Sequence, residues 1–497
     1  MGYAWNMKIP QEVIIVLEKL EASGHKARLV GGCVRDLLLG KKVEDWDIAT
    51  SAKPEEIMSV FSDSKYENEF GTVLVKLDEA AREKTDIKVV EVTTFRKEAR
   101  YSDKRHPDQV EFTDKLEDDL ARRDFTINAL AFDLKTTAKK SKLDYELVDS
   151  FNGQRDLEDK IVRAVGDPEK RFAEDALRMM RAVRFAAQLG FEIEAKTKEA
   201  IKKNAPWLEH ISKERIRVEL EKIIMSDNAE QGIRDLQDLG LLSFFMPELE
   251  KGIGVAQNRH HVYEVFEHNV RSLGFAAQKK FSLAVRLAAL LHDIGKVQTK
   301  QGNGLEATFY NHEYVSAKQA RDILERLRFS REMIKKVVHL IRYHMFVYDV
   351  GTVSEAGVRR LVKRIGPENL DEAFDVRVAD RLGSGCPKAV PYKLRHLRYM
   401  MEKVAKDPIS VKMLKVNGHD IMQTLGVAPG PKVGAILDVL LAEVIEEPKR
   451  NTKEYLEPRV LELDKENLNK LREMAKEVIE ERREKEDREI KQKHWVE

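Results

Sequence analysis

The chain has 497 residues, which is too long for one ordinary hydrophobic core, so three or four domains are expected. Charged residues make up 35% of the chain, yet 87 Lys and Arg against 86 Asp and Glu leave a formal net charge of +1. This balance excludes attraction of nucleic acid by net charge alone, so a nucleic-acid partner would have to bind to a local basic face.

Cysteine usage and apolar runs indicate the compartment. Cys33 and Cys386 lie far apart without a CxxC pattern, so neither a disulfide framework nor a zinc ribbon is expected, and a reducing compartment fits. The first residues, MGYAWNMKIP, lack a signal-peptide pattern, and no apolar run approaches the roughly 18 residues of a membrane span. The sequence therefore predicts a cytoplasmic protein without a membrane partner.

The first elements of the chain are a helix and a glycine turn. Residues 10–24 carry apolar side chains at helical spacing, and the pattern stops at Gly24. The stretch LVGGCVRDLLLGKKVEDWDIAT, residues 29–50, follows as turn, helix and strand. Gly31 and Gly32 would offer backbone N–H groups at a helix N-terminus to an anion, and Arg35 could reach the same anion.

A pair of carboxylates closes this stretch. Asp45 and Asp47 are two positions apart in a segment with strand character, so both side chains point to the same side of the pleat. Two parallel carboxylates repel each other unless a cation lies between them, and Mg²⁺ is the simplest such cation. Together with the glycine turn this predicts nucleotide chemistry, although a loop with two solvated aspartates has the same pattern.

Strand patterns dominate the chain up to residue 160. After a predicted helix at 51–61, they occur at 71–78, 87–95, 109–113, 127–134 and 145–150, which predicts an α+β domain over residues 1–160. Glu91 could be a third acidic group near the metal, but an ordinary polar strand position is favoured. Arg96 to Pro107 has no hydrophobic periodicity and is predicted as a long mobile loop, with a mere insertion as the alternative.

Polar residues suited to nucleotide binding follow this loop. Arg122, Arg123 and Asp124 place arginine beside aspartate, which suits them to hold a triphosphate and a ribose hydroxyl. From about residue 155 the periodicity becomes helical. Asp175 and Arg178 are predicted on one face of a helix, where an intrahelical ion pair is the alternative interpretation.

A carboxylate and a guanidinium can recognise a base together. The carboxylate accepts a hydrogen bond from an exocyclic amino group, and the guanidinium donates one to the adjacent ring nitrogen. Cytosine and adenine present that edge, whereas guanine and uracil present the reverse. The pair therefore predicts selection of C and A without a nucleic-acid template.

The second half of the chain is predicted to be helical, with a further set of metal ligands. Imidazoles and carboxylates in this order suit a divalent ion, Mn, Ni, Fe or Mg: His268, His292, Asp293, His312, His344 and Asp380. Gly430 and Pro431 mark a turn between two helices. Residues 465–497 are mostly charged and predict a solvated helix that frays at its end.

Several of these stretches resemble one family. GGCVRDLLLG with DWDIAT, RRDFTINA and EDALRMMR are similar to motifs of class II nucleotidyltransferases of the polymerase-β-like superfamily, which include tRNA CCA-adding enzymes and bacterial poly(A) polymerases. The ordered set H, HD, H, H, D resembles an HD-type phosphohydrolase domain. The resemblance implies an α+β fold with a nucleotidyltransferase head containing a mixed sheet (1–160), an all-α neck (161–225), an HD-containing body (226–408) and a helical tail (409–497).

The resemblance also implies roles for individual residues. Asp45 and Asp47 would be catalytic and hold Mg²⁺, and the neck residues Asp175 and Arg178 would read the base, with Glu174 orienting the arginine. Glu214 and Arg215 would support this helix. The remaining nucleotide-binding residues implied are Gly31, Gly32, Arg35, Arg122, Arg123, Asp124 and Arg181. His268, His292, Asp293 and Asp380 would be the HD ligands, with His312 and His344 near a second position.

The implied activity is template-independent addition of CCA to the 3′ end of tRNA from CTP and ATP. The partners would be the tRNA 3′ end and acceptor stem, with the tail contacting tRNA, and not DNA. The loop at Arg96 to Pro107 would serve the addition of the terminal A. An enzyme that adds only that A, beside a CC-adding partner, stays open, as does an HD phosphohydrolase with a degenerate transferase head. A poly(A) polymerase fits less well because EDALRMMR is not the basic variant of its motif.

Overall fold

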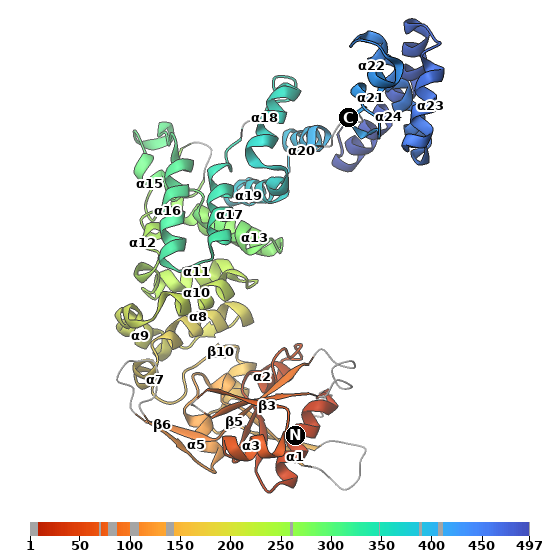
Figure 1. Ribbon diagram of the computed structural model, residues 1–497. Helices are drawn as coiled ribbons and strands as arrows, with labels where there is room; N and C mark the ends of the chain where they lie inside the picture. Colours follow the sequence, from red (N-terminus) through yellow and green to blue (C-terminus); the bar gives the residue numbers. More distant parts are fainter. Residues whose placement is uncertain are drawn as a thin grey trace. The chain divides into compact units, whose positions relative to one another are not determined.

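The structure is a computed structural model, and it describes residues 8–68, 71–77, 87–99, 109–135, 144–258, 262–346, 348–386, 390–405 and 411–496. The chain divides into two compact units (Figure 1). The first comprises Met1–Arg342 and Ala379–Gly385, and the second comprises Tyr343–Val378 and Cys386–Glu497. Among the described residues, no helix combines the length and the apolar character that crossing a membrane would require.

A mixed sheet forms the start of the first unit, as predicted. Over the described residues its strand order is β3-β4-β5-β2-β1-β8-β9, in which β2 and β5 are parallel and the other neighbours antiparallel. The strands are β1 (Ala27–Val30), β2 (Asp47–Thr50), β3 (Ser64–Asn68), β4 (Thr72–Lys76), β5 (Val89–Thr94), β8 (Ala131–Lys135) and β9 (Asp144–Val148). A separate hairpin pairs β6 (Arg96–Ala99) with β7 (Gln109–Phe112).

The predicted strands correspond to β4, β5, β7, β8 and β9, with two differences. The predicted loop from Arg96 is wrong at its start, because Arg96–Ala99 forms β6 through backbone pairing with β7; residues 100–108 lie outside the described residues. The strand predicted at 127–134 starts only at Ala131, because Thr126–Asn128 forms the 3₁₀ turn η1. That turn is held by the Thr126 N–H, which donates to the Arg163 carbonyl.

Short helices flank the sheet. They are α1 (Gln11–Ala22), α2 (Gly32–Leu38), α3 (Pro54–Val60), α5 (Leu116–Ala121) and α6 (Gly153–Glu158). The helix predicted over 10–24 is confirmed as α1, whose apolar face is buried. It ends where Gly24 adopts a φ of +87°, a conformation that glycine permits without steric cost.

Helices make up most of the rest of the first unit. They are α7 (Pro168–Glu174), α8 (Leu177–Leu189), α9 (Ala195–Asn204), α10 (Lys213–Ile224), α11 (Ala229–Asp238), α12 (Pro247–Glu250), α13 (Val265–Gln278), α14 (Leu283–Leu291), α15 (Lys296–Thr299), α16 (His312–Arg326) and α17 (Arg331–Arg342). A short parallel pairing of β10 (Ile161–Val162) with β11 (Glu192–Ile193) brackets α8. The buried Arg286 of α14 donates to the carbonyls of Ile224 and Ser226, which ties the end of α10 to the helices that follow.

The second unit is helical in its described part. Its helices are α18 (Glu355–Ile365), α20 (Tyr392–Ala405), α21 (Gly418–Leu425), α22 (Pro431–Glu446), α23 (Lys453–Leu463) and α24 (Leu468–His494), and α19 (Leu370–Gly383) begins in it. Pro431 starts α22, as the predicted turn requires. The prediction that the last helix frays is wrong: Ile490 and Val496 are buried in one cluster with Tyr399 of α20, so apolar contacts hold the end of α24.

Candidate active site

A pocket of about 880 Å³ lies within the first unit, between the sheet domain and the helices α8 and α10. Among the described residues it has ten Arg and Lys side chains against six Asp and Glu side chains, so its lining is net positive. The predicted site residues that line it are Gly32, Arg35, Asp45, Asp47, Arg122, Arg123, Asp124, Asp175, Arg178 and Arg181. One cavity therefore brings together predicted site residues that are up to 149 positions apart in the chain, Gly32 and Arg181.

The carboxylate pair stands at the start of β2. Asp47 is the first residue of that strand and Asp45 precedes it, while Trp46 between them is only 4% exposed. Burial raises the pKa of Asp47 to about 6; Arg123 opposes this shift and the Asp45 carboxylate adds to it. Both carboxylates thus face the pocket, as predicted, and their mutual repulsion is what a bound cation would relieve.

Glu91 lies next to this pair. It is the register partner of Asp47 across the parallel strands β2 and β5. Its pKa is raised by burial and by the nearby Asp47 carboxylate. The sequence favours an ordinary polar strand position for Glu91, but the pairing of β2 with β5 places its carboxylate beside Asp47 as a third acidic group.

The glycine turn acts differently from the prediction. The Gly31 N–H donates to the Leu130 carbonyl at 3.0 Å, so this donor is used within the fold and not offered to an anion. Glycine is needed at position 31 because a side chain would collide with Arg123: a Cβ atom there would lie 2.5 Å from Nη1 of Arg123 and 3.6 Å from an Asp47 carboxylate oxygen. Arg35 is held at the pocket wall by Asp36 and by Asn128, whose Oδ1 accepts at 2.8 Å.

A buried carboxylate orients the arginine pair. Asp119 of α5 is 0% exposed and accepts from Arg122 at 2.7 Å and from Arg123 at 3.3 Å. Burial alone would raise the pKa of Asp119, but the guanidinium groups lower it overall. Sequence analysis missed Asp119, although its spacing of three and four residues before these arginines on a helix could have indicated it.

Asp124 joins the sheet domain to α8. Its carboxylate accepts from Arg181 Nε at 2.7 Å and Nη2 at 2.5 Å, and also from Asn128 Nδ2 and the Phe125 N–H. Burial opposes ionisation, but Arg181 and Asn128 hold the pKa of Asp124 far below its usual range. In this structure the carboxylate is therefore engaged by protein groups, and its contact with a ribose stays a prediction.

The proposed base readers do not lie on one continuous helix, so that prediction is wrong. α7 ends at Glu174, Asp175 has the extended backbone angles φ −139° and ψ 106°, and α8 starts at Leu177. The break occurs because the Asp175 carboxylate accepts from the Leu177 N–H at 3.0 Å, an interaction typical of a helix start.

The side chains still meet around the break. Arg178 donates to Glu174 at 2.5 Å and to the Arg122 carbonyl at 3.1 Å, as expected for an arginine that Glu174 orients. Asp175 accepts from Arg215 of α10 at 2.7 Å, which is the supporting contact predicted for Arg215. Glu214 instead lies 3.8 Å from the exposed Arg328.

Phe185 of α8 is a pocket residue that sequence analysis missed. Its side chain is 6% exposed, and the guanidinium carbons of Arg35, Arg181 and Arg184 lie 5.2, 5.4 and 4.1 Å from its ring centroid. Beneath it, Arg184 forms a buried ion pair with Glu219 of α10 at 3.2 Å. The contact with Arg35 joins α2 to α8, so helical spacing carries no signal for it, whereas Arg181 lies four residues before Phe185 on α8 and could have indicated that contact.

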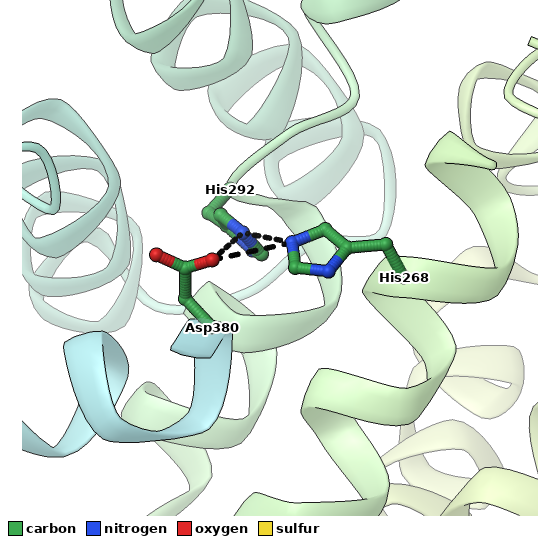
Figure 2. Close-up of side chains that lie close together, drawn as sticks. All are labelled: His268, His292 and Asp380. Atoms are coloured by element: carbon green, nitrogen blue, oxygen red, sulfur yellow. Dashed lines mark hydrogen bonds and ion pairs between the residues drawn. The ribbon is translucent and has the colours of Figure 1, made fainter. Parts of the chain in front are cut away.

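A second candidate site gathers histidine and aspartate inside the first unit (Figure 2). His268 of α13, His292 after α14 and Asp380 of α19 point toward one another. The two Nε2 atoms are 3.0 Å apart, and Asp380 Oδ1 lies 3.3 and 3.6 Å from them. Two imidazoles and a carboxylate at this spacing fit one divalent ion.

Charge at this cluster also favours a cation. Burial lowers the pKa of His292, but Asp293 and Asp380 outweigh burial and raise it to about 10. Asp293 is shared between His312 at 3.2 Å and the buried Lys296 at 2.6 Å. Within the first unit the structure thus assembles five of the six predicted ligands; His344 belongs to the second unit, and its place at the site stays a prediction.

Comparisons with known proteins agree with this geometry. Family models match a poly A polymerase head domain at residues 27–163, a probable RNA and SrmB-binding site of polymerase A at 190–253, and an HD domain at 261–384. A CCA-adding enzyme of Limosilactobacillus reuteri is 34% identical over 456 residues, which cover 91% of this chain and 96% of that protein. The chain belongs to the CCA-adding enzyme family.

Other CCA-adding enzymes support the assignment. That of Ligilactobacillus salivarius is 35% identical over 453 residues, covering 90% of this chain and 96% of the relative. A solved structure of the Bacillus stearothermophilus CCA-adding enzyme in complex with CTP has a TM-score of 0.59 and 29% identity, covering 92% of this chain and 98% of that one.

Membership of the CCA-adding enzyme family confirms the predicted tRNA nucleotidyltransferase with an HD domain, and a degenerate transferase head is not favoured. Domains of both kinds generally use divalent metal ions.

Proposed function

We propose that this chain adds C, C and A in turn to the 3′ end of tRNA, using CTP and ATP, in the cytoplasm. The observation that carries the proposal is that one pocket holds both a carboxylate pair, Asp45 and Asp47, and a base-reading pair, Asp175 and Arg178. A nucleotide bound there would have its triphosphate near the first pair and its base near the second. The residue ranges 1–160, 161–225, 226–408 and 409–497 would act as head, neck, body and tail.

The residues of the pocket divide the chemical work. Asp45 and Asp47 would hold Mg²⁺, because carboxylate oxygens are the ligands that this ion prefers. The ion would stabilise the negative charge that develops as the RNA 3′-hydroxyl attacks the α-phosphorus of the nucleotide and pyrophosphate leaves. Arg122 and Arg123, fixed by Asp119, would balance the charge of the triphosphate. Because these donors are held before substrate arrives, the reaction needs little reorganisation.

Base selection would follow from hydrogen bonding. Asp175 would accept from the exocyclic amino group of C or A, and Arg178 would donate to the adjacent ring nitrogen. Arg215 and Glu174 hold these side chains in place. A base with the reverse edge would leave buried polar groups unpaired, which disfavours G and U.

The test uses tRNA transcripts that end before CCA, after C and after CC. Purified protein with Mg²⁺ receives CTP, ATP or both, and product lengths are read on a gel. Complete CCA on the shortest transcript is the expected result. Extension of only the CC-ended transcript, by one A, would instead make the protein an A-adding enzyme that needs a CC-adding partner.

The second site suggests a second activity, metal-dependent phosphohydrolysis, because His268, His292 and Asp380 are gathered within 3.6 Å. Mn²⁺, Ni²⁺, Fe²⁺ or Mg²⁺ would fit there. Hydrolysis of a phosphodiester substrate by the wild-type protein, lost in Asp380→Ala while CCA addition continues, would establish this activity. Absence of hydrolysis with all four ions would leave the cluster a structural element.

A further inference from the structure

The nucleotide pocket is lined by two helices that pack together and run in the same direction, α8 and α10. Asp175 contacts Arg215 at the start of α8 and α10, and Arg184 contacts Glu219 further along both. Arg215 and Lys222 are seven residues apart on α10, so they lie on the same face and about 10.5 Å apart along its axis. The pocket therefore extends about two helical turns beyond the base readers, which is more than a base requires.

The far end of the pocket is lined by lysines from both sides. Lys222 and Gln188 are exposed residues near the C-terminal ends of α10 and α8, and Lys41 and Lys42 come from the segment after α2. The pKa of Asp227, just after α10, is lowered first by its hydrogen bond to Lys280 and also, through charge, by Lys41. Lys41 therefore lies near the end of α10, and both it and Lys222 of that helix line the pocket.

The reaction brings two polyanions to one carboxylate pair. The nucleotide is accounted for by the base readers at one end and by the arginines beside them. The RNA strand must enter with its terminal hydroxyl next to Asp45 and Asp47, and its last phosphates then need cations on the other side. Lys41 and Lys42 precede Asp45 by four and three residues, so the same short segment carries lysines and carboxylate.

We infer that Lys41, Lys42 and Lys222 bind the phosphate groups of the last nucleotides of the RNA strand and so seat its 3′-hydroxyl at the carboxylate pair. This inference rests on the proposed function. Lysine suits the task because its ammonium group is a compact charge that binds phosphate without reading sequence. These lysines are positioning residues for the RNA, distinct from the arginines assigned to the incoming triphosphate.

Steady-state kinetics separate the two substrates. With a tRNA transcript ending in CC and ATP, Lys222→Ala and Lys41→Ala should raise KM for the RNA by roughly tenfold each, while KM for ATP stays unchanged. Because a lost phosphate contact releases fewer counterions, the slope of log KM for RNA against log salt should fall by about 0.7. Lys202→Ala and Lys65→Ala, exposed lysines outside the pocket lining, serve as controls.

An unchanged KM for RNA would overturn the inference, and so would a rise in KM for ATP alone, which would assign these lysines to the triphosphate. A second measurement uses a CC-ended transcript whose last internucleotide phosphate is replaced by a neutral methylphosphonate. If Lys222 binds that phosphate or its neighbour, Lys222→Ala should have a smaller effect on this RNA than on the natural one. Equal effects on both RNAs would refute the contact.

Binding without turnover separates this inference from the proposed function. Fluorescence anisotropy of the labelled CC-ended transcript, with no nucleotide present, should show weaker binding by Lys222→Ala than by Lys202→Ala. If the wild-type protein binds the RNA in this way but adds no nucleotide, the proposed function fails while the RNA site stands. If both variants bind equally, the RNA site fails whatever the activity.

Discussion

Gly31→Ala tests the geometry of the pocket through one methyl group. Gly31 has φ +79° and ψ −132°, a conformation largely reserved for glycine, so a side chain there costs about 1–3 kcal/mol of strain. Its Cβ would lie 2.5 Å from Nη1 of Arg123, so that guanidinium must move away from Asp119 and the Asn128 carbonyl. Losing one charged hydrogen bond adds about 1.5–3 kcal/mol.

We therefore expect Gly31→Ala to lower the free energy of unfolding by roughly 2.5–6 kcal/mol, measured by urea denaturation. Displacing Arg123 by about 1 Å should lower kcat/KM for CTP about 100-fold. Gly24→Ala is the matched control, because Gly24 has φ +87° but no heavy atom within 4 Å of the added Cβ. It should lose stability from strain and keep its kcat/KM. Wild-type kcat/KM in Gly31→Ala would refute the argument.

Other substitutions test separate parts of the molecule. Glu174→Gln removes the charge that holds Arg178, so kcat/KM for UTP relative to CTP should rise about tenfold, and an unchanged ratio would contradict the orienting role. In equilibrium dialysis with excess Mg²⁺ present to occupy the Asp45 and Asp47 site, His292→Ala should lose the bound Mn²⁺ of the wild type while CCA addition continues; an unchanged Mn²⁺ stoichiometry would remove His292 from the ligands. Burial raises the pKa of Glu402, but hydrogen bonds from His494 and Lys493 lower it overall, from 4.5 to about 2. Its contribution to stability is therefore present above pH 4.5 and lost as the pH falls towards 2, so the difference in urea midpoint between wild type and Glu402→Gln should shrink from about pH 5 to about pH 3.

Local patterns in the sequence identified many of the residues that line the pocket. The Asp45 and Asp47 pair was found because alternation along a strand is a short-range rule, and the structure has them flanking the buried Trp46. The helix assumed for EDALRMMR failed, because the side chain of Asp175 competes with the backbone and starts a new helix at Leu177.

Contacts between distant segments could not be predicted in this way. The ion pair of Asp124 with Arg181 joins residues 57 positions apart, and the ring of Phe185 on α8 contacts Arg35 of α2. β6 was missed for a related reason: its charged residues give no alternation, and its backbone pairing with β7 defines it. Pairing and burial arise only when the chain has folded.

The break in the helix before α8 gives the base-reading pair unequal freedom. Arg178 belongs to the first turn of α8, so its backbone is fixed by helical hydrogen bonding, whereas Asp175 sits on extended backbone between two helices. A small change in the torsions of Asp175, together with a shift of its partner Arg215, can therefore carry the carboxylate nearer to or farther from Arg178 without unwinding either helix. We expect the fixed Arg178 and the adjustable Asp175 together to accommodate both a pyrimidine and a purine. Asp175→Glu, which lengthens the side chain of the adjustable residue, should change the rates of C and A addition by different factors.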